Sequence, residues 1–204
     1  MLNRLRNTLK HSIIYGLGRL GTKIIGLVLL PLYTQYLTTE QYGMLSLLEA
    51  TVQIMVGMLG FRLSSAMMRW IATEKDEDKN KTVVFTTYLS TVGFSLLICL
   101  LLIPFTGFLS QLYFSSGDFS SYFLILIIAV ALDLPNHVTF DLIRMAEKSW
   151  LFITIIIVKL SVVLGLNIYF VAYLHLGVEG IMIGMASGNF IMLVMSLPFI
   201  LKRI

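Results

Sequence analysis

Charged side chains interrupt the apolar stretches of this chain, and their chemistry is the first question that the sequence raises. Seven of them are formally charged and one is a histidine: Arg19, Lys23, Glu49, Arg62, Asp133, His137, Asp141 and Lys159. A charge near the middle of a bilayer costs roughly 3 kcal/mol, so seven that face lipid would cost about 20 kcal/mol. We therefore expect these side chains to face one another or water. Cations in such a low-dielectric cavity attract an anion strongly.

Two of the cations share a helix face near the amino terminus. Arg19 and Lys23 are four residues apart, which places them on one side of a helix. Arg19 lies about 10 Å from the inner boundary, so its stem can either snorkel to the surface or reach a cavity. Lys23 lies about 16 Å deep, beyond comfortable snorkelling, and we assign it to a cavity. Arg62 either pairs with a carboxylate to hold helices in register or binds a substrate.

A second polar stripe falls in the fourth predicted helix. Asp133, His137, Asp141 and Arg144 follow one another at steps of four, four and three residues, which aligns them on one face. Histidine titrates near neutrality, so the stripe is either an ion-coupling relay or an internal salt-bridge cluster. Lys159 is either a partner for Asp133 or Asp141, or a substrate-binding residue.

The elements that carry these stripes are predicted to be membrane helices. Of 204 residues, 57% are apolar and 13% are charged, with a mean hydropathy of +0.88, so there is too little polar surface for a water-soluble domain. A hydrocarbon core takes roughly 20 helical residues to cross. Glu49 and Gln53 add a short polar edge on the second helix, and inward polar stripes predict a hydrated cavity. We expect one all-α bundle over 1–204, with six transmembrane helices at about 12–37, 44–71, 83–105, 121–143, 150–173 and 180–201.

The distribution of lysine and arginine predicts the orientation. With the amino terminus in the cytoplasm, eleven of the fifteen basic residues fall on that side. The three opposite loops, around Thr38, Gly117 and His175, carry no lysine or arginine. Trp70 and Trp150 fall at the inner interface, as aromatic residues often do. Both termini are therefore expected in the cytoplasm.

The sequence predicts no metal, cofactor or nucleic-acid site. Its single cysteine, Cys99, cannot build a disulfide or a zinc site, and a net charge of +4 is small for a nucleic-acid binder. The G-x-G-x-x-G over Gly16–Gly21 lies within an apolar helix with no strand before it. A dinucleotide-binding motif needs that strand, so we do not assign one here. Gly180, Gly184 and Gly188 repeat every four residues and predict a close helix contact.

Five segments at the ends of predicted helices form a recognisable series. They are Tyr15–Gly18, Leu30–Gly43, Arg69 before a charged turn, Leu142–Lys148 and Gly177–Ile181. In this order the chain resembles, over nearly all of its length, the amino-terminal half of a bacterial oligosaccharide flippase. That family is also called the polysaccharide biosynthesis proteins, within the multidrug, oligosaccharidyl-lipid and polysaccharide exporter superfamily.

The resemblance implies a V-shaped inner-membrane transporter of two six-helix lobes that performs no covalent chemistry and is not an enzyme. Its central cationic cavity would receive the diphosphate and sugars of a polyprenyl-diphosphate-linked oligosaccharide, for cell-surface polysaccharide synthesis. The lipid tail would stay among the membrane lipids while the lobes alternate access. Arg19, Lys23 and Arg62 match the basic residues of such cavities.

Members of the family usually have about twice as many spans, so this chain corresponds to one lobe. A truncated product, a fragment or one half of a homodimer would each fit, and a lone lobe is not expected to flip lipid. The rivals are a drug or cation antiporter of the same superfamily, a membrane glycosyltransferase or polymerase, and a non-transporting scaffold. An antiporter cavity would be dominated by acids such as Glu49 and Asp133, whereas here cations are at least as numerous. An enzyme would need larger loops at the membrane face.

Overall fold

The computed structural model describes residues 26–59 and 63–203, and all of the regular structure in them is helical. The predicted all-α fold is therefore confirmed. Three of the predicted site residues, Arg19, Lys23 and Arg62, lie outside the described residues, as does the glycine motif over 16–21. The described part of the first predicted span is helical over 26–36.

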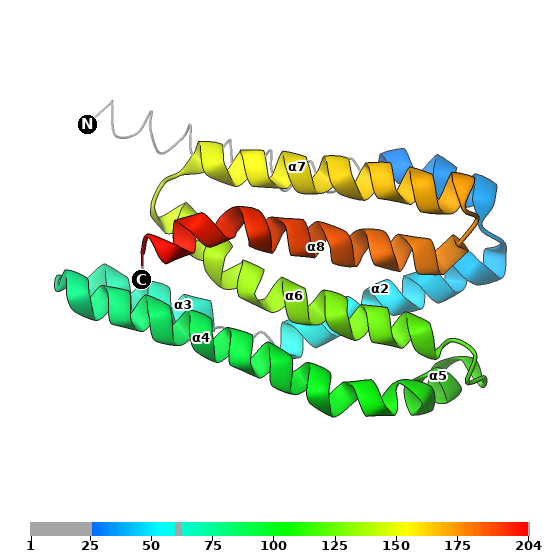
Figure 1. The fold of residues 1–204 in the computed structure, drawn as a ribbon, viewed down its shortest axis with the longest axis horizontal. Coiled ribbons are helices and arrows are strands. Elements are labelled where there is room, and N and C mark those ends of the chain that lie inside the picture. The colour runs from blue at the N-terminus through cyan, green and yellow to red at the C-terminus, as the bar shows by residue number, and fades with distance from the viewer. Residues whose placement is uncertain (1–25, 60–62, 204) are drawn as a thin grey trace.

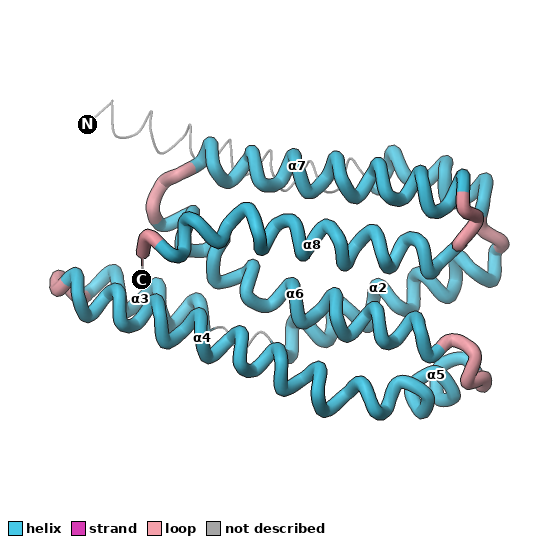
Figure 2. The backbone as a smooth tube through the Cα atoms, in the orientation of Figure 1, coloured by secondary structure: helices cyan, strands magenta, loops and turns pink. Residues whose placement is uncertain are grey.

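The remaining helices follow in chain order with short connections (Figures 1 and 2). They are α2 (Thr39–Leu59), α3 (Leu63–Thr73), α4 (Glu77–Leu102), η1 (Ile103–Phe105), α5 (Thr106–Phe114), α6 (Ser120–Met145), α7 (Ser149–Asn167), the π-helical η2 (Ile168–Tyr173) and α8 (Gly177–Leu201). The predicted span 44–71 thus comprises α2 and α3, on either side of residues 60–62.

Five helical runs are long and apolar enough to cross a membrane. They are Thr39–Leu59, Glu77–Phe114, Ser120–Met145, Ser149–Tyr173 and Gly177–Leu201. The run from Glu77 joins α4, η1 and α5 over 38 residues, well beyond the predicted 83–105. The chain is therefore a multi-pass membrane protein.

The turns between the helices gather at two ends of the bundle (Figure 2). We call the end with the turns at 74–76 and 146–148 and the last residues of α8 the charged end. The other end, with the turns at 37–38, 115–119 and 174–176, we call the aromatic end. There the rings of Tyr36 and His175 lie 6.2 Å apart, which brings the first and last of these turns together. Loops at alternating ends are what successive membrane spans require. The cytoplasmic placement of the charged end remains a prediction.

Helix α6 is central, with α8 and α4 as its main neighbours (Figure 1). The glycine stripe of α8 faces α7 and η2. A Cβ on Gly180 would lie 2.6 Å from Phe170 Cβ, and one on Gly184 would lie 2.9 Å from Asn167 Oδ1. A Cβ on Gly188 would also collide with an α7 side chain. Because these glycines have no side chains, α8 can approach α7 and η2 closely, as the four-residue spacing predicts.

Candidate functional site

Two hydrophobic clusters fill the bundle, one toward each end. On α6 and α8 the cluster at the aromatic end includes Val130 and Met182, and the cluster at the charged end includes Val138 and Met192. Five polar residues of α6, α7 and α8 lie at the level between these pairs. We call them the mid-span polar layer: Asp133, Asn136, His137, Lys159 and Asn189.

Asn189 connects the three helices of this layer. Its Oδ1 accepts a 2.8 Å hydrogen bond from Lys159 Nζ on α7, and its Nδ2 donates to the Ala129 carbonyl of α6 at 3.0 Å. In return, Asn136 Nδ2 on α6 donates to the Asn189 carbonyl at 3.0 Å. Asn136 and Asn189 are only 1% and 4% exposed. Buried amides without partners would be costly, so these bonds both satisfy them and tie α6, α7 and α8 together.

Helix α6 continues through Pro135, which stands beside this network. Proline has no N–H and therefore removes one bond from the helical ladder. Two side chains bond to the backbone around it. Asn136 Nδ2 also donates to the Leu132 carbonyl at 3.0 Å, and Thr139 Oγ1 donates to the Pro135 carbonyl at 3.2 Å. Such bonds help a membrane helix to tolerate proline.

The predicted stripe on α6 consists of two ion pairs. His137 Nε2 lies 3.3 Å from Asp133 Oδ2, one helical turn away. Nearer the charged end, Arg144 Nη1 lies 3.4 Å from Asp141 Oδ1, and its guanidinium stands over the Phe152 ring of α7 at 5.8 Å. Each carboxylate thus has a neighbour of opposite or titratable charge on its own helix.

A pocket of about 350 Å³, which we call the mid-span pocket, is lined by both ion pairs and by Lys159. Two carboxylates, one imidazole and two cations therefore meet in one cavity between α6, α7 and α8. Asn136 lines it as well, and its buried Oδ1 accepts no hydrogen bond from the described residues. A ligand hydroxyl or a water molecule would satisfy this acceptor once the atoms that cover it move aside.

Lys159 reaches this pocket past a glycine. Its bond to Asn189 replaces the ion pair with Asp133 or Asp141 that the sequence raised, because no described carboxylate lies within ion-pair distance of its ammonium group. A Cβ on Gly188 would meet Lys159 Cγ at 3.5 Å. The bare backbone of α8 thus leaves room for the lysine stem. An ammonium group has three N–H donors, so two remain for a ligand.

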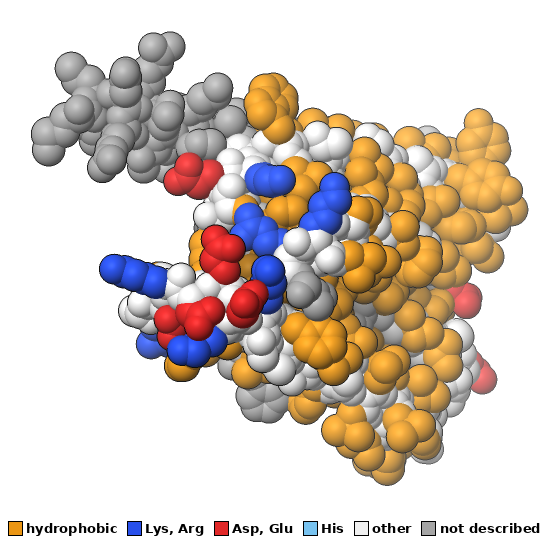
Figure 3. Space-filling model, turned by 60° about the vertical axis from the view of Figure 1, so that its left-hand side comes forward, with side chains coloured by type: hydrophobic (Ala, Val, Ile, Leu, Met, Phe, Trp, Pro, Cys, Tyr) orange, Lys and Arg blue, Asp and Glu red, His pale blue; other side chains and the backbone are white. Residues whose placement is uncertain are grey.

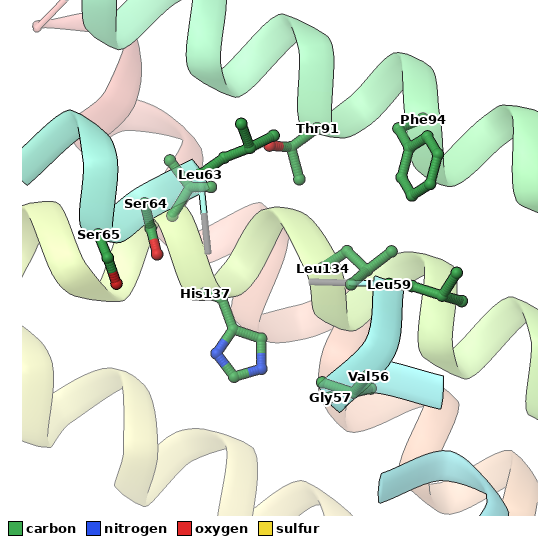
Figure 4. A pocket seen from close by; sticks show the side chains of 11 residues that line it. Val56, Gly57, Leu59, Leu63, Ser64, Ser65, Thr91, Phe94, Leu134 and His137 are labelled. Atoms are coloured by element: carbon green, nitrogen blue, oxygen red, sulfur yellow. The ribbon is translucent and has the colours of Figure 1, made fainter. Parts of the chain in front are cut away.

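His137 also lines a second pocket, of about 270 Å³, between α2, α3, α4 and α6. Figure 4 shows its ring projecting from α6, with Ser64 and Ser65 of α3 on one side and Val56 and Gly57 of α2 on the other. Neither serine hydroxyl forms a hydrogen bond with another described residue. The imidazole therefore lines both the mid-span pocket and a second cavity whose lining includes two serine side chains.

The structure brings together four of the predicted site residues, namely Asp133, His137, Asp141 and Lys159. Glu49 does not join them: it is exposed on α2 and pairs with no described cation. The sequence reasoning missed Asn136 and Asn189. The available signal was an asparagine inside an apolar span, since such residues commonly bond across membrane helices.

Comparison with known proteins places this geometry in a family. The profile of the family described as "Polysaccharide biosynthesis protein" matches residues 8–204. The chain belongs to this family. No curated protein matches the chain significantly.

A solved structure shares the fold. It is described as the outward-facing conformation of a multidrug resistance MATE family transporter of the MOP superfamily. It superposes with a TM-score of 0.75 at 18% identity, over 95% of this chain and 43% of the other. Together with the family match, this confirms the resemblance to the exporter superfamily. The chain spans less than half of the length of that transporter.

Proposed function

We propose that this family member is one lobe of a flippase that moves polyprenyl-diphosphate-linked oligosaccharide across the bacterial inner membrane by alternating access. The observation that carries the proposal is the mid-span pocket, which holds charged groups between two hydrophobic clusters. Charges kept at that depth indicate a path for a polar cargo. Membership of the polysaccharide biosynthesis family supports a glycan as that cargo.

The pocket chemistry suits a diphosphate-linked sugar. Lys159 keeps two donors for phosphate oxygens, and we propose that Arg19, Lys23 and Arg62 contribute further positive charge. The free acceptor of Asn136 suits a sugar hydroxyl. The lipid tail would remain in the bilayer while one lobe rocks against the other.

Transport is proposed to need a second six-helix lobe, supplied either by a carboxy-terminal half or by another copy of the chain. The support is that the chain covers 43% of the transporter whose fold it shares. Expressed alone in a flippase-deficient strain, the chain should insert but should not restore surface polysaccharide. Restoration by a chain that in-membrane crosslinking shows to be monomeric would overturn the need for a second lobe.

A drug or cation antiporter is the second candidate, because the same pocket holds two carboxylates and a histidine. The shared fold with a multidrug transporter fits it too. In an antiporter, Asp133 and Asp141 would bind the cationic substrate directly.

One experiment separates the two functions. Lys159→Gln and Asp133→Asn would be introduced into the two-lobe protein, with Lys79→Gln in the exposed first turn of α4 as the control. A flippase should lose most surface glycan with Lys159→Gln and accumulate lipid-linked glycan inside. Unchanged glycan export by Lys159→Gln, combined with increased drug sensitivity of Asp133→Asn, would replace the flippase by the antiporter.

A further inference from the structure

A separate basic pocket lies at the charged end of the bundle. It has a volume of about 350 Å³ and forms where the start of α4 meets the last turns of α6 and α8. Figure 3 shows lysine, arginine and acidic side chains gathered at this end, while hydrophobic side chains cover much of the remaining surface in view. This pocket shares no lining residue with the mid-span pocket.

Three cations and one carboxylate line the basic pocket, so its lining is net positive. The cations are Lys81, Lys202 and Arg203, and the carboxylate is Glu77. Lys202 and Arg203 form no ion pair with a described residue. Lys81 has only a 3.5 Å contact with Asp78, whose side chain is 93% exposed. Such a pair contributes little, so the positive charge of the pocket is largely unneutralised.

An unused hydrogen-bond acceptor lies in the same pocket. Asn80 donates through Nδ2 to the Glu74 carbonyl at 3.2 Å, which fixes the orientation of its amide. Its Oδ1 is buried and accepts no hydrogen bond from a described residue. A ligand hydroxyl that displaces the atoms covering this acceptor would satisfy it.

The rest of the lining is apolar. Val84 and Leu142 are buried at 4% and 1% exposure, and Ile71 and Met145 complete this surface. The ligand that fits this lining therefore has three parts: a phosphate for the cations, a hydroxyl for Asn80 and an apolar portion for the apolar wall. A membrane lipid reaches the ends of transmembrane helices, and basic pockets between such helices bind anionic headgroups.

We infer that this pocket binds an anionic glycerophospholipid with a hydroxyl-bearing headgroup, of which phosphatidylglycerol is the simplest. The inference is independent of the flippase proposal, because it uses none of the mid-span residues. The lipid would join α4, α6 and α8 at the end where no side-chain hydrogen bond between described residues links them.

Native mass spectrometry of the full chain in detergent tests the inference. Phosphatidylglycerol would be titrated in competition with phosphatidylethanolamine. The pocket variant is Lys81→Gln with Arg203→Gln, and the matched control is Lys75→Gln with Lys79→Gln, which removes the same charge from the neighbouring turn. We expect the wild type and the control to bind one phosphatidylglycerol tightly, and the pocket variant to bind it about tenfold more weakly or worse. Thermal unfolding verifies that both variants are folded. Equal affinity in the two variants would overturn the site.

Two further arms define the ligand. Asn80→Ala should remove a preference for phosphatidylglycerol over phosphatidic acid, which lacks the headgroup hydroxyls, while keeping the affinity for phosphatidic acid. No such preference in the wild type would overturn the assignment to Asn80. Soluble glycerol phosphate should bind far more weakly than the lipid. If it binds equally well, the pocket is a site for a soluble phosphate and the lipid assignment is wrong.

Discussion

Lys159 and Asn189, thirty residues apart in the chain, meet at mid-span through a 2.8 Å hydrogen bond between α7 and α8. The bond holds a cation at depth without neutralising it, because its partner is an amide. An ammonium group paired with a carboxylate would have little attraction left for an anionic ligand. One held by an amide has a fixed position and keeps N–H donors for a ligand, and both favour the binding of a phosphate.

Asn189→Leu should destabilise the bundle by about 1–3 kcal/mol. The change removes the acceptor of Lys159 and the donor to the Ala129 carbonyl, and it leaves a half-buried cation without its hydrogen-bond partner. Unfolding in mixed detergent micelles would measure the loss. Ser196→Ala is the control, because that hydroxyl is also buried in α8 but bonds only within its own helix, to Leu193. Equal effects of the two changes would contradict the bridging role. A double-mutant cycle with Lys159→Met should give a coupling of about 0.6–2 kcal/mol.

Gly188→Ala should cost about 1–3 kcal/mol, because its Cβ would collide with Val163 Cγ2 and crowd the lysine stem at Lys159 Cγ. Gly165→Ala is the matched control in α7. Nothing lies within 4 Å of its Cβ position, so we expect it to be neutral or up to about 1 kcal/mol stabilising. The midpoints of thermal unfolding would be compared. Adding Val163→Ala should rescue part of the Gly188→Ala loss, and a failure of that rescue would argue against the steric explanation.

Lys23→Ala should abolish glycan export while leaving membrane insertion intact. The expectation comes from the sequence, which places this lysine too deep to snorkel. Surface polysaccharide and membrane-extracted protein would be measured together in the two-lobe protein, beside Lys79→Ala as a charge-matched control. Normal export from Lys23→Ala would remove this residue from the site.

His137→Gln distinguishes an ion-coupling relay from a salt-bridge cluster. Histidine changes its charge between about pH 5 and 8, so a relay should make transport depend on pH across that window, and the substitution should flatten the profile. Asp133 and Asp141 from α6 and Lys159 from α7 face the same pocket and set the local field. Transport would be followed from pH 5 to 8, with thermal stability measured in parallel. Lowered stability with an unaltered pH profile would assign the pair to structure.

The all-α membrane fold could be predicted from the sequence because composition largely specifies membrane spans. Steps of four and three residues also place Asp133 beside His137 and Asp141 beside Arg144, since these relations lie within one helix. The glycine spacing on α8 similarly indicates a close neighbour, though not which helix it is. These features depend on local geometry, which periodicity encodes.

Relations between helices were much less accessible. The partner of Lys159 is set by how α7 and α8 align, and sequence spacing within one helix carries no information on that alignment. For the same reason Glu49 was grouped with acids that the structure places elsewhere.

The long run from Glu77 to Phe114 has a geometric consequence for the whole lobe. Thirty-eight residues of helix extend about 57 Å, nearly twice the roughly 30 Å thickness of hydrocarbon. Unless it is strongly tilted or bent, a helical run of that length projects past the hydrocarbon at one end. Exposed Phe108 and Leu112 on α5 would then lie along the membrane boundary. Their contact with the boundary would resist rotation of the lobe about its own axis.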